Sequence, residues 1–189
     1  MRRLLWERNL RDEILAAYDV KMPDPLPSFV CGSPGRFVVA CGRSTLGCSL
    51  ESGRVLWHAP VWVTYYSPNV YEGRVYVAHM DRSIAIDEAT GEVLYDVSHP
   101  ELRGAVLWRP GTVYGETIAY ANEQGLVAIF DRRDGSLVEI HKYKAPLWGT
   151  AEADGRLLVS TGDGKLLVFE EKPAGSKRDR TDGRRSMEP

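Results

Sequence analysis

Three aromatic side chains recur at one register of this chain, and their chemistry suits them to binding. Tyr66, Trp108 and Trp148 each stand seven residues before a recurring glycine, and Tyr65 and Arg109 adjoin two of them. Such rings stack on peptides, sugars or flat heterocycles, and aromatic and arginine side chains commonly anchor interfaces. These five residues are therefore the candidate binding site. The alternative is that the rings pack between structural units as core.

The other reactive residues do not form a recognisable catalytic or metal-binding set. The four histidines are scattered along the chain, at positions 58, 79, 99 and 141. Three cysteines with no CxxC pair do not predict a zinc site. Acidic residues such as Asp87, Asp131, Asp134 and Asp154 lie in turn-like segments, where a structural role explains them. We expect a protein that is not an enzyme and that holds no metal or cofactor.

Length and charge indicate one ordinary domain without a nucleic-acid or membrane function. The chain has 189 residues, is 43% hydrophobic and carries a net charge of −2. That charge gives no basic field for nucleic acid. No apolar stretch is long enough to span a membrane, and the charged residues of 1–8 interrupt any signal-peptide run. We therefore expect a cytoplasmic protein, with a basic, disordered tail over residues 172–189.

A sequence motif repeated about every forty residues must form the fold that positions the aromatic residues. Its opening glycines, Gly35, Gly73, Gly115 and Gly155, are 38, 42 and 40 residues apart. Each glycine precedes β-branched and aromatic residues, then a short polar turn, a second apolar run, and a turn such as 87–91 or 131–135. With the segment that leads into the next glycine, each unit supplies four antiparallel strands. Such a period is typical of a β-propeller blade.

The repeated sequence motif also resembles that of a known family. Gly73-Arg-Val-Tyr-Val followed by Ser83-Ile-Ala-Ile-Asp-Glu-Ala-Thr-Gly-Glu-Val-Leu-Tyr95 is similar to the quinoprotein-type repeat found in BamB-like proteins and in pyrroloquinoline quinone (PQQ) dehydrogenases. The resemblance covers about residues 28–170. It implies an all-β propeller and a protein-docking role. The dehydrogenases of this class carry adjacent cysteines, which this chain lacks, so the resemblance does not extend to a quinone cofactor.

The two ends of the repeat region complement each other. Residues 4–10 are similar to the last strand of a unit, as at Val55–Trp57, whereas the final copy stops after one strand fewer, near Glu170. We expect a strand at 4–10, with an amphipathic helix over 4–17 as the alternative. The expected domains are residues 1–27 (outer strand and proline-rich linker), 28–171 (propeller repeats) and 172–189 (tail).

Four blades lie at the lower limit for a propeller, so three arrangements stay open. The chain forms a compact four-bladed ring, pairs as a homodimer into an eight-bladed ring, or is part of a longer protein. In each case the favoured function is a non-enzymatic scaffold that binds a protein partner through its funnel face. The alternative is a quinoprotein-like enzyme or a degenerate PQQ- or sugar-binding propeller.

Overall fold

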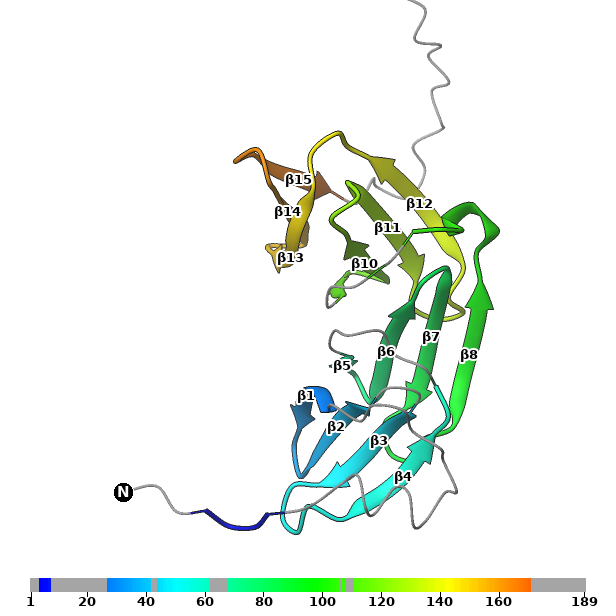
Figure 1. Ribbon diagram of the computed structural model, residues 1–189, viewed down its shortest axis with the longest axis vertical. Coiled ribbons are helices and arrows are strands. Elements are labelled where there is room, and N and C mark those ends of the chain that lie inside the picture. Colours follow the sequence, from blue (N-terminus) through cyan, green and yellow to red (C-terminus); the bar gives the residue numbers. More distant parts are fainter. Residues whose placement is uncertain are drawn as a thin grey trace, which may run out of the picture.

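Four antiparallel sheets follow one another along a crescent in the computed structural model of the chain (Figure 1). The structure describes residues 4–7, 27–41, 44–61, 68–105, 107 and 111–170. The strands within each sheet are neighbours in sequence order, as expected for meanders. Strands β1, β5 and β13 lie along the concave side of the crescent, and β4, β8 and β12 along the convex side (Figure 1). These sheets are the predicted propeller blades.

Blade 1 consists of β1 (Pro27–Ser33), β2 (Arg36–Cys41), β3 (Ser44–Ser49) and β4 (Val55–Ala59). Blade 2 consists of β5 (Asn69–Tyr71), β6 (Arg74–His79), β7 (Arg82–Asp87) and β8 (Val93–Ser98), followed by the short 3-10 helix η1 (Pro100–Leu102). Blade 3 consists of β9 (Thr112–Tyr114), β10 (Thr117–Ala121), β11 (Leu126–Asp131) and β12 (Leu137–Lys142). Blade 4 consists of β13 (Leu147–Ala153), β14 (Arg156–Thr161) and β15 (Leu166–Glu170). The segment before each repeat glycine is thus the first strand of the blade that contains that glycine.

The recurring turn between the third and fourth strands is closed as the sequence predicts. In blade 2, Asp87 Oδ1 accepts hydrogen bonds from the backbone N–H groups of Ala89 and Thr90, at 2.9 and 2.8 Å. Gly91 adopts a φ of +79°, and its N–H donates to the Asp87 carbonyl at 2.9 Å. The Thr90 hydroxyl and backbone bonds hold the pKa of Asp87 below its usual value. The carboxylate therefore stabilises this turn in its ionised form.

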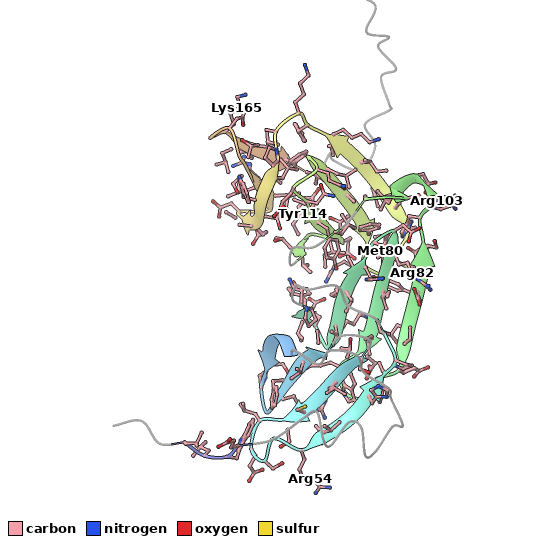
Figure 2. All side chains as sticks on the ribbon, in the orientation of Figure 1. Arg54, Met80, Arg82, Arg103, Tyr114 and Lys165 are labelled. Carbon is pink, nitrogen blue, oxygen red and sulfur yellow. The ribbon has the colours of Figure 1, made fainter. Side chains whose placement is uncertain are left out.

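Most of the hydrophobic core lies between successive blades, and a further cluster covers the face of blade 1 that points away from blade 2. On β6, Val75 and Val77 pack against blade 1. Tyr76 lies between them in sequence and contacts blade 3 instead. Because side chains alternate across a strand, an interior blade buries both faces, which explains its nearly continuous apolar sequence. Tyr114 belongs to the cluster between blades 3 and 4, the position where Figure 2 labels it.

An aromatic side chain on the outer strand of each of the first two blades contacts the next blade. Trp57 of β4 is 5% exposed, and its indole N–H donates to the carbonyl of Glu88 in blade 2, at 2.7 Å. The same ring lies against Gly91. Tyr95 of β8 lies against Gly135 of blade 3 in the equivalent way. Glycine at these turns therefore serves two needs, a positive φ and room for the neighbouring ring.

The arrangement of the two ends of the crescent differs in part from the sequence prediction. Among the described strands, the stronger contacts between sheets join only sheets that are successive in sequence, and blades 1 and 4 lie at opposite ends of the open crescent (Figure 1). Leu4–Glu7, the described part of the strand expected at 4–10, carries no strand. Strand β1 begins at Pro27, inside the expected linker. The alternative helix over 4–17 and the tail at 172–189 lie mostly or wholly outside the described residues.

Candidate binding site

Trp148 is the one predicted site residue that the structure describes, and it is half-exposed. It lies near the start of β13, where the pairing with β14 shifts between Leu147↔Thr161 and Gly149↔Ser160. This shift leaves Trp148 in a β-bulge, a device that redirects a side chain out of the regular ladder. Its exposed fraction is 50%, whereas the adjacent Leu147 is fully buried. Trp148 is therefore a surface residue and not part of the core between blades.

The ring of Trp148 rests on a turn that has no room for a larger residue. A Cβ atom at Gly162 would lie 2.7 Å from Trp148 Nε1 and 2.7 Å from Pro146 Cγ. The Gly162 N–H also donates to the Pro146 carbonyl at 2.7 Å, which fixes the β14–β15 hairpin against the start of β13. The turn at Gly162 thus supports the indole, whose side chain is half exposed.

The other four predicted site residues, Tyr65, Tyr66, Trp108 and Arg109, lie outside the described residues. The register of blade 1 gives indirect information on the position they share. There the pairing of β1 with β2 shifts between Pro27 and Phe29, so Ser28 occupies the bulge that Trp148 occupies in blade 4. Ser28 also stands seven residues before its repeat glycine. The sequence spacing therefore marks a real structural position in the two blades where it is described.

Sequence analysis missed a charged hollow between blades 2 and 3. A cavity of about 260 Å³ is lined by Glu72, Arg74, Tyr76, Glu116, Arg132 and Arg133. The Arg132 guanidinium lies 3.2 Å from Glu72 Oε2 and 4.8 Å from the centre of the Tyr71 ring. Arg132 follows the turn aspartate of blade 3, so its position in the repeat was visible in the sequence. What the sequence did not show is that the first hairpin of blade 2 supplies its partner carboxylate.

A second hollow lies between blades 1 and 2, and there the repeat position of Arg132 is occupied by an acidic residue. Glu88 follows the turn aspartate of blade 2, and its carboxylate accepts a hydrogen bond from the Ser33 hydroxyl of blade 1. Glu88 is 7% exposed although it is acidic. This cavity measures about 510 Å³ and is open to the surface near Pro34 and Gly73. Both hollows therefore mark where the first hairpin of one blade meets the next.

Two of the histidines that sequence analysis considered are buried in the described region. His99 Nε2 lies 2.8 Å from Ser83 Oγ, and the Ser83 hydroxyl donates to the Gly135 carbonyl at 2.6 Å. Because the serine proton is used in that bond, His99 must be the donor to Ser83, with its proton on Nε2. Burial lowers the pKa values of both His99 and His79. This chain of bonds ties blade 2 to blade 3, which is a structural role.

Over the described ranges, no three His, Cys, Asp or Glu side chains lie close enough together to hold a metal ion. Cys48 of β3 is fully buried among the apolar side chains of blade 1. The part of the chain that the structure describes also contains no helix long and apolar enough to cross a bilayer.

A family model described as outer membrane protein assembly factor BamB matches residues 2–169 of the chain. The chain belongs to the BamB family. The match begins before the first described strand and includes Leu4–Glu7, in agreement with the repeat-like sequence of that segment. It ends at the last strand of blade 4, so it covers the whole crescent.

One BamB relative is the outer membrane protein assembly factor BamB of Marinobacter adhaerens, at 27% identity over 132 residues. The aligned region is 66% of this chain but 32% of that protein. The chain thus spans about a third of the length of this curated relative. The name of the relative concerns the outer membrane, so the cytoplasmic location expected from composition remains a prediction.

Solved structures agree with the fold. The computationally designed Ika4 protein superposes with a TM-score of 0.62 at 13% identity, over 80% of this chain and 94% of that chain. Hsv2 of Kluyveromyces lactis superposes with a TM-score of 0.60 at 14% identity, over 75% of this chain and 48% of that one. At these identities the similarity shows a shared blade arrangement and nothing about ligands. The Ika4 match shows that a whole chain of about this extent exists with similar blades.

Proposed function

We propose that this BamB-family chain is a non-enzymatic scaffold that binds a protein partner through its funnel face, with Tyr65, Tyr66, Trp108, Arg109 and Trp148 as the binding residues. The observation that supports this proposal is the half-exposed Trp148 on its rigid support. A large ring with few rotatable bonds gives contact area at a small cost in conformational entropy. An aromatic side chain that is held in place in this way is typical of an interface anchor.

The name of the curated relative supports a protein partner over a small-molecule substrate, because an assembly factor acts on other proteins. We further propose that two copies of the crescent pair to complete one ring of eight blades, since its two ends do not meet within one chain. In such a ring the loops of both copies would surround one central channel. The binding surface would then be composed of residues from both chains.

A photo-crosslinking experiment tests the binding proposal. A photoreactive amino acid replaces Trp148 in cells, and a matched variant carries it at Leu94, which is 43% exposed on the outer strand β8. We expect a discrete crosslinked protein from position 148 and none from position 94. The same partner should be lost from affinity-purified complexes when Trp148 is changed to alanine. Equal crosslinking from both positions, or none from position 148, would contradict the proposal.

A further inference from the structure

Trp6 contacts blade 1 although it belongs to none of the described strands. Its indole N–H donates to the Leu50 carbonyl at 2.9 Å. Its ring stacks on Phe37, with 5.7 Å between ring centres and 15° between planes. Phe37 belongs to a buried cluster with Val39 and Leu46, on the face of blade 1 that points away from blade 2. Leu4–Glu7 is therefore attached to the outer face of the first blade.

This contact reproduces the one that links blade 1 to blade 2. Trp57 donates to the Glu88 carbonyl, as Trp6 donates to the Leu50 carbonyl. Glu88 and Leu50 occupy the same position of the repeat, three residues before the turn glycine. Trp6 thus contacts blade 1 in the way that an outer-strand tryptophan of a preceding blade would contact it. Leu4–Glu7 therefore occupies the place of the outer strand of a preceding blade, although it forms no strand in the single chain.

Blade 4 lacks the strand that this segment represents. Within the described part of the chain, β15 pairs only with β14, so its other edge carries no partner strand. Leu166 and Val168 point from β15 to the face that has no neighbouring blade, and they are 62% and 54% exposed. An unpaired edge beside exposed apolar side chains is a site for strand addition. Lys165 marks this free end of the crescent, remote from the first blade (Figure 2).

We propose that Leu4–Glu7 of one copy forms the fourth strand of blade 4 of a second copy, pairing antiparallel with β15. The register follows from the complete blades. In blade 1, Trp57 pairs with Gly47 and Val55 with Cys48, and the residue between them bulges outward. Transferred to blade 4, this register places Trp6 opposite Val168 and Leu4 opposite Phe169. Leu5 takes the bulge.

This register gives Leu5 the place of a bulge residue that is exposed in the complete blades. Leu56, Leu94 and Val138 occupy it in blades 1 to 3, and they are 50%, 43% and 49% exposed. Leu5 is 70% exposed. An apolar residue at this position is therefore exposed in every complete blade, whereas the next residue in blades 1 and 2, Trp57 or Tyr95, contacts the neighbouring blade. Trp6 and Leu5 should consequently differ sharply in their effect on pairing.

The arrangement is a reciprocal exchange, because each copy donates one strand and accepts one. Two copies related by a two-fold axis satisfy both ends and form a closed ring, whereas a rotation that does not close gives a longer chain of molecules. The surface newly buried lies mainly at blade 4, since Phe37, Val39 and Leu46 are already buried on blade 1. The inference rests on the proposed pairing of two copies and names the contact that makes it.

Mass in solution and crosslinking test the exchange. We expect light scattering to give twice the 21.1 kDa of one chain for the wild type. The Trp6→Ala variant should give the mass of one chain, and the matched Leu5→Ala variant should keep the doubled mass. Circular dichroism of each variant checks that the blades are folded.

A second measurement needs no substitution. Isotopically light and heavy proteins are unfolded together, refolded and treated with a zero-length carboxyl–amine crosslinker. The proposed register puts Glu7 diagonally across from Lys165, within reach of long side chains. A Glu7–Lys165 crosslink that joins light to heavy chains supports the exchange. The same crosslink confined to chains of one label would overturn it in favour of closure within one molecule.

The remaining outcomes separate the exchange from the ring. A wild-type monomer overturns both. A doubled mass that Trp6→Ala leaves unchanged, without a mixed crosslink, overturns the exchange and leaves the pairing of copies intact. A larger mass with the mixed crosslink supports the exchange and overturns the closed two-copy ring.

Discussion

Replacing Gly91 by alanine tests whether the turn glycine makes room for the tryptophan of the preceding blade. The backbone at Gly91 has a φ of +79°, and an added Cβ would lie 2.8 Å from both Cδ2 and Cε3 of Trp57. Gly73, in the same blade, has a φ of +72° and no atom within 4 Å of its added Cβ. The two glycines therefore share the backbone requirement and differ in the contact.

The magnitudes follow from this difference. A left-handed conformation costs an L-residue roughly 1–2 kcal/mol, which is the whole effect expected for Gly73→Ala. Overpacking a rigid core site adds about 1–3 kcal/mol. Gly91→Ala should therefore destabilise the protein by about 2–5 kcal/mol. The excess over Gly73→Ala measures the contact with Trp57.

Urea unfolding followed by far-UV circular dichroism gives both free energies. A double-mutant cycle with Trp57→Ala assigns the excess, because the second alanine should cost less once the ring is gone. Equal losses of stability for Gly91→Ala and Gly73→Ala would refute the argument that the ring dictates the glycine. Additive effects in the cycle would refute it independently.

Other predictions concern charge and burial between the blades. Since burial lowers the pKa of His99, the folded state disfavours its protonation; the free energy of unfolding should fall as the pH drops below about 6.5, the unfolded value. His99→Asn, which keeps a donor for Ser83, should flatten that decline in pH-dependent melting curves. Arg132→Met removes a nearly buried cation from its carboxylate and aromatic partners and should cost about 1–3 kcal/mol in urea unfolding. Glu72→Gln should cost less than about 1 kcal/mol, because the Glu72 side chain is 66% exposed; a larger loss would show that the ion pair itself stabilises the junction.

The sequence predicted the elements that depend on local chemistry. Asp87 and Gly91 mark a turn through a side-chain bond and a positive φ, both of which are properties of a few adjacent residues. The β-branched and aromatic residues of β6 predicted a strand for the same reason. The partners of Arg132 and the support under Trp148 come from residues many positions away. Such contacts depend on how far successive blades rotate, which a repeat period does not specify.

The prediction of a strand at 4–10 shows the same difference between features set by adjacent residues and features that depend on distant ones. Leu4–Trp6 has the sequence of an outer strand, and Trp6 makes the contact that such a strand would make. A strand also needs a neighbouring edge, and no described strand pairs with this segment. The sequence pattern therefore identified a segment that packs like an outer strand, whereas the predicted strand is absent from Leu4–Glu7.

The residue that follows the turn aspartate in blades 2 and 3 affects which blades can pack together during folding. Modules with nearly identical strands are at risk of joining in the wrong order, because their apolar faces are interchangeable. Glu88 meets Ser33 at one junction, and Arg132 meets Glu72 at the next. A misplaced neighbour would set Glu88 against the carboxylate of Glu72, or leave Arg132 with Glu116 of its own blade but without Glu72, at a cost in free energy either way. The residue at this one variable position therefore favours packing against the correct neighbouring blade over packing against the other, similar blades.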